Sequence, residues 1–292
     1  MTHPVRHLEI ELKSPEQIRL MRAAGLVVAD TLAKLRDATK PGVSTAELDA
    51  IAEASIREAG AIPSFLGYQG YPASICSSVN DQVVHAIPSP DQVLREGDLI
   101  SIDCGADLDG WHGDAAITVP VGDVARDHLR MITVAEDAMW AGITAAAQGL
   151  RSGRGRLTDI SHAVQSSIRT AGRYGIVEGY GGHGIGSAMH QDPLVLNSGR
   201  PGKGPRLVPG MALAIEPMIT RGKPGVAELD DDWTVVTVDG SIAVHVEHTI
   251  ALCTDGVWVL TAHDGGQSRL GDLITAEASL KASTRFQDPA YE

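Results

Sequence analysis

The sequence of 292 residues can bury a substantial core, in one large domain or two small ones, and 43% of its residues are hydrophobic. Its 24 basic and 37 acidic residues give a formal net charge of −13, which argues against broad nucleic-acid binding or adhesion to an anionic membrane. Three scattered cysteines without C-x-x-C spacing indicate neither a disulfide framework nor a structural zinc site.

No export or membrane segment is predicted. The first residues, MTHPVRHLEIELKSPEQ, contain no apolar stretch of the kind found in secretory signals. No later run approaches the length of a membrane span. We therefore expect a protein of the reducing cytoplasm.

The first third of the chain predicts two helices and a loop. Residues 14–39 form the first helix, because Ser14 suits the N-cap of a capping box and a proline follows it. A second capping box at Ser44 opens another helix over residues 44–60. Residues 65–87 are irregular and aromatic, and we interpret FLGYQGYP as a loop that shapes a pocket.

The rest of the chain mixes strands and helices without regular βαβ alternation. A hairpin is predicted where LDGWHG, with its Asp-Gly turn signal, joins two apolar strands. The other predicted elements are helices over 127–148 and 158–171 and strands over 211–219, 233–238 and 241–252. This order is typical of an α+β fold. The segment after about residue 260 is polar, carries no motif and is interpreted as an appended tail.

Carboxylates occur inside strands that otherwise suit a core. Asp103 lies in LISIDCGA and Asp114 directly precedes AAITV, so folding of the hairpin places them opposite or diagonal to each other. Glu216 interrupts MALAIEPMI, and Glu247 interrupts IAVHVEHTIAL. Asp and Glu are depleted in strands, and a buried carboxylate without a partner is costly. Each alone could be a half-exposed position, but four in one chain indicate a shared cation.

A metal supplies the missing partner for these carboxylates. Oxygen ligands with one imidazole suit hard or borderline divalent ions such as Mn, Fe(II), Co or Mg. The candidate imidazole is His183 in GGHGIG, where the glycines allow close approach of the backbone. From the residues alone, a turn histidine is the simpler interpretation of His183.

The order of motifs resembles the type I methionine aminopeptidases over roughly residues 14–255. The motifs are VNDQVVHAIP, SIDCGADLDGWHGDAA, GHGIGSAMHQDP, ALAIEP and VEHT. The resemblance implies a pita-bread fold, a mixed, largely antiparallel sheet with helices on its outer face and two pseudo-symmetric halves. It also implies an N-terminal extension over 1–13, a catalytic domain over 14–258 and a tail over 259–292.

By this resemblance the chain binds two divalent ions, with Co, Mn, Fe(II), Zn or Ni as candidates. The implied ligands are Asp103, Asp114, His183, Glu216 and Glu247. Of these, Asp103 chelates one ion, Asp114 and Glu247 bridge both, and His183 and Glu216 complete the other shell. A metal-activated water then attacks the peptide carbonyl, and Glu216 carries its proton toward the leaving amine.

The resemblance also implies two catalytic histidines and a methionine pocket. His85 contacts the scissile amide nitrogen and the substrate backbone, and His190 stabilises the oxyanion of the tetrahedral intermediate. The pocket positions are Phe65, Tyr68, Tyr71, Cys76, Met189 and Trp233. The family usually has Gly where this chain has Ala86, and Phe65 and Met189 also depart from its common residues.

The implied activity is removal of the initiator methionine from nascent proteins whose second residue is small. The enzyme would act as a monomer, and a cluster at Arg151, Arg154 and Arg156 could contact the ribosome, although a solvated loop is the simpler interpretation. The alternatives are an Xaa-Pro aminopeptidase or prolidase, which normally carries a large extra N-terminal domain, and a non-enzymatic binding protein on the same fold. A plain acidic interaction protein leaves the strand carboxylates unexplained.

Overall fold

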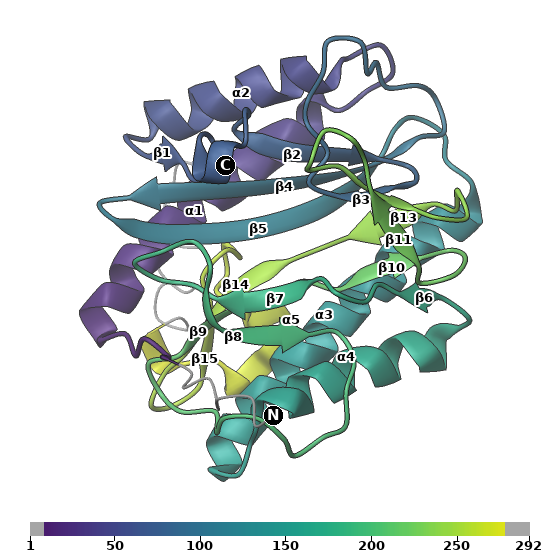
Figure 1. The fold of residues 1–292 in the computed structure, drawn as a ribbon. Helices are drawn as coiled ribbons and strands as arrows, with labels where there is room; N and C mark the ends of the chain where they lie inside the picture. Colours follow the sequence, from purple (N-terminus) through teal and green to yellow (C-terminus); the bar gives the residue numbers. More distant parts are fainter. Residues whose placement is uncertain (1–8, 278–292) are drawn as a thin grey trace, which may run out of the picture.

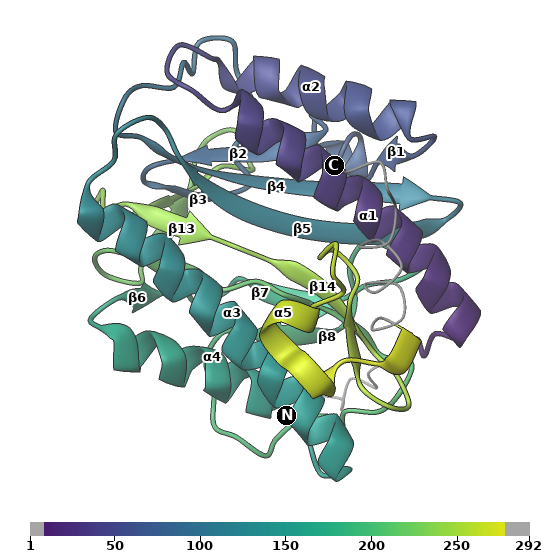
Figure 2. The ribbon, with the colours of Figure 1, turned by 180° about the vertical axis from the view of Figure 1, so that it is seen from behind.

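Two pairs of long helices cover one side of the molecule, and antiparallel strands form the other (Figures 1 and 2). The computed structural model describes residues 9–277. The first pair is α1 (Pro15–Ala38) and α2 (Thr45–Glu58), and the second is α3 (Arg126–Ser152) and α4 (Leu157–Ala171). Each pair packs on its own set of strands, which confirms the predicted α+β class and agrees with an arrangement in two halves.

Local signals in the sequence account for the helix boundaries. In both capping boxes the serine hydroxyl accepts from the backbone N–H three residues on, and the serine N–H donates to the side chain of that residue. The helix α3 extends beyond the predicted 127–148 and ends at Gly153, whose φ of 65° is the left-handed conformation that glycine adopts readily.

The sheet of the first half is built on a long hairpin. Its strands are β4 (Leu99–Leu108) and β5 (Trp111–Pro120), and β4 also pairs with β2 (Ile75–Val79) and β1 (Ile62–Pro63). The hairpin turns at Asp109 and Gly110, which both have positive φ, as the Asp-Gly signal predicts.

The main sheet of the second half has the strand order β15-β14-β9-β7-β8. Its strands are β7 (Gly181–Gly184), β8 (Gln191–Leu196), β9 (Ala212–Ile215), β14 (His248–Leu252) and β15 (Val257–Val259). Two small three-stranded sheets complete the structure, with strands β3 (Gln82–Val84), β6 (Gly175–Ile176), β10 (Met218–Thr220), β11 (Val226–Glu228), β12 (Val235–Thr237) and β13 (Ala243–His245). The halves join where the backbones of Ala116 and Glu247 exchange hydrogen bonds of 2.9 and 3.4 Å.

Several sequence-based predictions need correction. The predicted strand 211–219 breaks at Glu216 and Pro217, and the predicted strand 241–252 breaks at Val246 and Glu247. At each break the chain leaves one sheet for another, because β9 pairs with β14 while β10 pairs with β13. The segment 65–87 is also less irregular than predicted. It contains η1 (Tyr68–Gly70), β2 and β3, whose partner strands lie far away in sequence.

The predicted C-terminal tail begins inside β15 and continues into the core. Leu260, Leu270 and Ile274 are buried, and the last of these follows α5 (Gln267–Leu270) and η2 (Gly271–Leu273). The Arg22 guanidinium, from α1, donates to four backbone carbonyls between residues 259 and 263. Residues up to 277 therefore pack with the core, residues 278–292 lie outside the described part, and the predicted domain limits at 14 and 258 stay predictions.

Candidate active site

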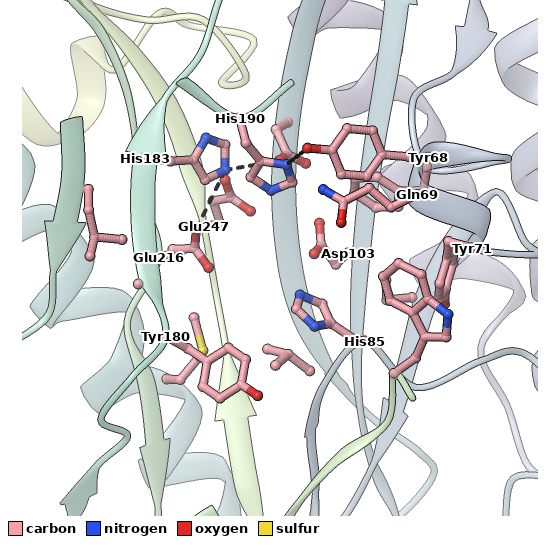
Figure 3. Close-up of a pocket in the computed structure, with 18 of the residues that line it drawn as sticks. Tyr68, Gln69, Tyr71, His85, Asp103, Tyr180, His183, His190, Glu216 and Glu247 are labelled. Atoms are coloured by element: carbon pink, nitrogen blue, oxygen red, sulfur yellow. Dashed lines mark hydrogen bonds and ion pairs between the residues drawn. The ribbon is translucent and has the colours of Figure 1, made fainter. Parts of the chain in front are cut away.

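A cavity of 590 Å³ is lined by residues of both halves, including Asp103 and Asp114 of the first half and His183 of the second. Figure 3 shows carboxylate and imidazole groups from several strands pointing into it. The predicted site residues that line it are Phe65, Tyr68, Tyr71, Cys76, His85, Asp103, Asp114, His183, His190, Glu216, Trp233 and Glu247. Every predicted site residue except Met189 is therefore brought to one place.

The hairpin places two aspartates on one face of the sheet. Asp103 of β4 lies opposite Ala116, and Asp114 of β5 lies opposite Gly105, so the aspartates are diagonal neighbours as predicted. The Thr249 hydroxyl donates to the Asp114 carbonyl oxygen at 2.7 Å and accepts from its N–H at 3.3 Å. This pair of bonds ties β5 to β14 at the position of the metal-ligand candidate.

The strand breaks place the two glutamates at the junction of the sheets. Glu216 follows β9, and its carbonyl oxygen accepts from the Asn197 side chain at 2.9 Å. Glu247 precedes β14, and its N–H donates to Ala116 at 2.9 Å. Both carboxylates are buried at the end of a strand rather than within one. The breaks in the strands thus aim both side chains into the cavity.

His183 presents one ring nitrogen to these carboxylates. Its Nε2 lies 3.7 Å from Asp114 Oδ2 and 3.7 Å from Glu216 Oε1. Its Nδ1 lies 2.9 Å from the Gly184 carbonyl oxygen, which can only accept a hydrogen bond. Nδ1 therefore carries the proton, and the lone pair of Nε2 faces the cavity as a metal ligand requires. Ligand atoms of Asp114, His183 and Glu247 lie within 4.8 Å of one another.

The carboxylates of this cluster repel one another, and a bound cation would stabilise them. Burial raises the pKa of Asp103 to about 6, and it raises the pKa values of Asp114 and Glu247 well above their ordinary range. The negative charges of neighbouring carboxylates raise these pKa values further. Asp103 Oδ1, Asp114 Oδ1 and Glu247 Oε1 are buried without a hydrogen-bond partner among the described residues. Orphaned, mutually repelling carboxylate oxygens beside an imidazole lone pair fit a divalent metal.

These shifts predict that the metal-free protein loses stability as the pH rises from about 5 to 8. The carboxyl groups of Asp103, Asp114 and Glu247 bind protons more tightly in the folded protein than in the unfolded chain. As the pH rises above their ordinary pKa of about 4, the free energy of unfolding therefore decreases. His245, whose pKa is also raised, acts in the same direction at higher pH. Urea unfolding with a chelator at both pH values measures the loss, expected on the order of a few kcal/mol.

Two comparisons make this pH prediction specific to the cluster. Added Mn²⁺ restores the stability at pH 8, and Asp114→Asn reduces the pH dependence of the metal-free protein because it removes one of the repelling charges. A chelated protein that is as stable at pH 8 as at pH 5 contradicts the repulsive cluster.

His245 is a buried member of the site that the sequence reasoning missed. Its Nε2 lies 3.4 Å from Glu216 Oε2. Burial alone would raise the pKa of Glu216, but the close pairing with the His245 imidazole lowers it, so Glu216 is ionised at neutral pH. The signal that could have found His245 is its position two residues before Glu247 in VHVEH, an unusual density of ionisable groups in an apolar segment.

The two predicted catalytic histidines lie on opposite sides of the carboxylates (Figure 3). His85 has a φ of 60°, a conformation rare for residues other than glycine and often kept at functional sites. Ala86, which follows it, is not among the residues of positive φ, so glycine is not required there. His190 Nδ1 lies 2.9 Å from the Tyr68 hydroxyl. Partial burial at the cavity wall lowers the pKa of His190 to about 4, although the side chain is still exposed to solvent.

The predicted methionine pocket is only partly as expected. Tyr71 and Trp233 form an edge-to-face pair at 5.0 Å, and Phe65 and Cys76 also line the cavity. Met189 is buried but does not line it. A Cβ at Gly105 would lie 2.9 Å from Phe65 Cε1 and 3.0 Å from Met189 Cε, so both side chains pack over this glycine. The sequence reasoning also did not single out other residues that line the cavity, among them Gln69, Val84, Tyr180, Leu194 and Met218.

Comparison with known proteins gives consistent matches over most of the chain. Residues 19–253 match Metallopeptidase family M24. Methionine aminopeptidase 1 of Mycobacterium tuberculosis is 54% identical over 85% of this chain and 94% of its own length. The crystal structure of methionine aminopeptidase from Rickettsia prowazekii superposes with a TM-score of 0.82 at 40% identity, covering 87% of this chain and all of that one.

A more distant structural match shows the fold alone. Xaa-Pro dipeptidase from Bacillus anthracis has a TM-score of 0.66 at 22% identity, and the match covers 86% of this chain but 61% of that one. The predicted pita-bread architecture is thus confirmed by both kinds of neighbour. Within residues 9–277, no helix combines the length and the apolar character needed to cross a bilayer.

Proposed function

This chain belongs to the methionine aminopeptidases of Metallopeptidase family M24, and we propose that it removes the initiator methionine from nascent polypeptides whose second residue is small. One observation carries the proposal. Buried carboxylates and the His183 imidazole line the same cavity as an aromatic wall that includes Tyr71 and Trp233. An apolar pocket beside a metal centre suits a methionine side chain whose peptide bond is to be hydrolysed.

The ligand set supports two divalent ions, chosen among Co, Mn, Fe(II), Zn and Ni. We assign Asp103, Asp114, His183, Glu216 and Glu247 as the ligands. When bound, the ions supply Lewis acidity and lower the pKa of water so that it can attack near neutral pH. The four carboxylates balance the charge of the ions, which makes the otherwise repulsive cluster stable.

Glu216 is proposed to move the proton during hydrolysis. It is ionised, since the neighbouring His245 lowers the pKa of its carboxyl group, so it can accept a proton from the attacking water. The same carboxyl then donates to the nitrogen of the leaving amine. His245 Nε2 lies 3.4 Å from Glu216 Oε2, and this pairing favours the ionised form of the Glu216 carboxyl group.

The two cavity histidines are proposed to bind the substrate amide. Burial lowers the pKa of His85, so its neutral ring can contact the scissile nitrogen and the peptide backbone. His190 is neutral as well, and an Nδ1 that accepts from the Tyr68 hydroxyl leaves Nε2–H to donate to the developing oxyanion. Phe65, Tyr71, Cys76 and Trp233 are proposed to surround the methionine side chain, and Met189 to support Phe65.

A short peptide panel tests the activity and its specificity. We expect Met-Ala-Ser to be hydrolysed to methionine and Ala-Ser, while peptides beginning Met-Lys or Xaa-Pro are cleaved poorly, because the second residue must fit beside the metal ligands. Liquid chromatography of the products at equal enzyme concentration measures the ratio. Cleavage of Xaa-Pro peptides with Met-Ala-Ser left intact would contradict the proposal and favour the proline-directed alternative, which has only the fold similarity in its support.

The site of action is proposed to be the cytoplasm, where nascent chains emerge, with the enzyme acting as a monomer. The predicted arginine cluster joins a second basic loop, because Arg156 donates to the Gly204 carbonyl oxygen and Arg206 donates to that of Gly153. Arg154 is exposed between these contacts. This basic surface on an acidic protein supports a transient contact with the ribosome, which stays a prediction.

A further inference from the structure

The loop that carries His190 is held from outside the cavity by a segment near the N-terminus. The Glu11 carboxylate, which lies upstream of the matched family region, accepts three hydrogen bonds from this loop. Oε1 accepts from the Ser187 hydroxyl at 2.7 Å. Oε2 accepts from the Ser187 N–H at 3.2 Å and from the Gln191 side-chain amide at 2.8 Å. Ser187 and Gln191 flank Met189 and His190 on both sides.

Lys13 completes the contact from a buried position. Its side chain is 2% exposed. The ammonium nitrogen Nζ donates to Gln191 Oε1 at 2.9 Å and to the Glu11 carbonyl oxygen at 3.1 Å. The same Nζ lies 3.3 Å from Glu11 Oε2. Its N–H also donates to the Gly210 carbonyl oxygen at 2.8 Å. Burying an ammonium group is costly, and burial lowers the pKa of Lys13. The side chain is therefore held in place by this specific set of partners.

The loop leaves room for these two side chains and is fixed on its inner side as well. A Cβ at Gly186 would lie 2.7 Å from Lys13 Nζ, so this close approach needs glycine. The Gly186 carbonyl oxygen accepts from the His112 N–H at 3.0 Å. Facing the cavity, His190 Nδ1 contacts the Tyr68 hydroxyl. The loop thus has one anchor on the cavity side and one on the outer side.

An ordinary surface ion pair adds little to the free energy of folding, but the contact made by Glu11 is of a different kind. Exposed pairs are worth about 0–1 kcal/mol and are screened by salt. Here several donors from a single loop converge on one carboxylate. These hydrogen bonds outweigh the effect of burial and lower the pKa of Glu11 to about 2, so Glu11 accepts them as an ionised carboxylate at neutral pH.

We propose that Glu11 and Lys13 are positioning residues that hold the loop over residues 185–191, and through it the His190 imidazole, in the place required for catalysis. This inference rests on the proposed role of His190. A misplacement of about 1 Å at a catalytic group can cost on the order of 100-fold in rate, so an anchor outside the cavity can control turnover without touching substrate.

The test is a double-mutant cycle in the full chain with Met-Ala-Ser as substrate. Glu11→Ala is expected to lower kcat about 10-fold with little change in KM or bound metal. In the His190→Ala background the same change should lower kcat less than about 2-fold, because the group it positions is gone. The control is Glu9→Ala, at an exposed carboxylate two residues away, which should leave kcat unchanged.

A second variant and a measurement independent of activity guard against simple misfolding. Ser187→Ala removes one donor from the loop side, and its effect should not add to that of Glu11→Ala. Hydrogen exchange at the Ser187 amide should accelerate in Glu11→Ala but not in Glu9→Ala, because this amide donates to Glu11.

Two results would overturn the inference. One is an active parent enzyme in which Glu11→Ala changes neither kcat nor exchange at Ser187. The other is an equal loss of kcat in the presence and absence of His190. A parent enzyme that fails to cleave Met-Ala-Ser would instead count against the proposed function, while accelerated exchange would still show that Glu11 anchors the loop.

Discussion

Replacing Asp114 with Asn is expected to lower bound metal and activity together, with kcat/KM reduced by about 1000-fold or more. Asp114 is buried at the junction of β5 and β14, close to both His183 and Asp103. Asn has nearly the same shape but supplies one neutral oxygen in place of a charged carboxylate. Metal analysis by mass spectrometry and Met-Ala-Ser hydrolysis on the same preparation measure both quantities.

The same substitution at Asp109 is the matched control for Asp114→Asn. Asp109 is exposed at the turn of the same hairpin, with a φ of 55° that Asn also tolerates. Asp109→Asn should therefore keep full metal and full rate. An Asp114→Asn protein with undiminished metal content and rate would exclude Asp114 as a ligand, whatever the control shows.

His190→Ala is expected to lower kcat by about 100- to 1000-fold while the metal content stays unchanged. The magnitude is that of removing one donor to an oxyanion, a bond formed mainly in the transition state, so KM should change much less than kcat. His190 is not among the proposed ligands, and its Nδ1, which faces the Tyr68 hydroxyl, leaves Nε2–H as the donor. Steady-state kinetics with Met-Ala-Ser and metal analysis separate this outcome from that of Asp114→Asn.

The control for His190→Ala is His162→Ala, an exposed histidine on α4 on the helical side of the molecule. It should leave kcat, KM and metal content unchanged. If His190→Ala lost metal in proportion to activity, His190 would act as a ligand or would support one, and its assignment to the oxyanion would be wrong.

Local signals allowed much of the fold to be predicted. The capping boxes at Ser14 and Ser44 and the turn at Asp109 each act within a few residues, and the structure contains all three as predicted. The four strand carboxylates were also visible, because a charge in an apolar segment conflicts with its surroundings. This conflict by itself predicts a shared hard-metal site, whereas the choice of His183 as a ligand depends on the family resemblance.

The features that were missed depend on contacts distant in sequence. The segment containing β2 is fully buried, but its sequence ICSSV does not alternate, and its partner β4 decides its conformation. His245 gains its role from Glu216, and Lys13 binds Gln191 across 178 positions of the chain. These contacts cannot be predicted from any short stretch of neighbouring residues. The strand breaks at Glu216 and Glu247 likewise follow from the exchange of strand partners.

The most direct test of the central claim is the hydrolysis of Met-Ala-Ser by protein stripped of metal and then titrated with Mn²⁺ or Co²⁺. The account predicts negligible cleavage by the stripped protein and activity that rises with bound metal. It also predicts that the Asp114→Asn protein does not recover over the same range. Full cleavage by protein shown to be metal-free, or a fully loaded and folded protein that leaves Met-Ala-Ser intact, would contradict it.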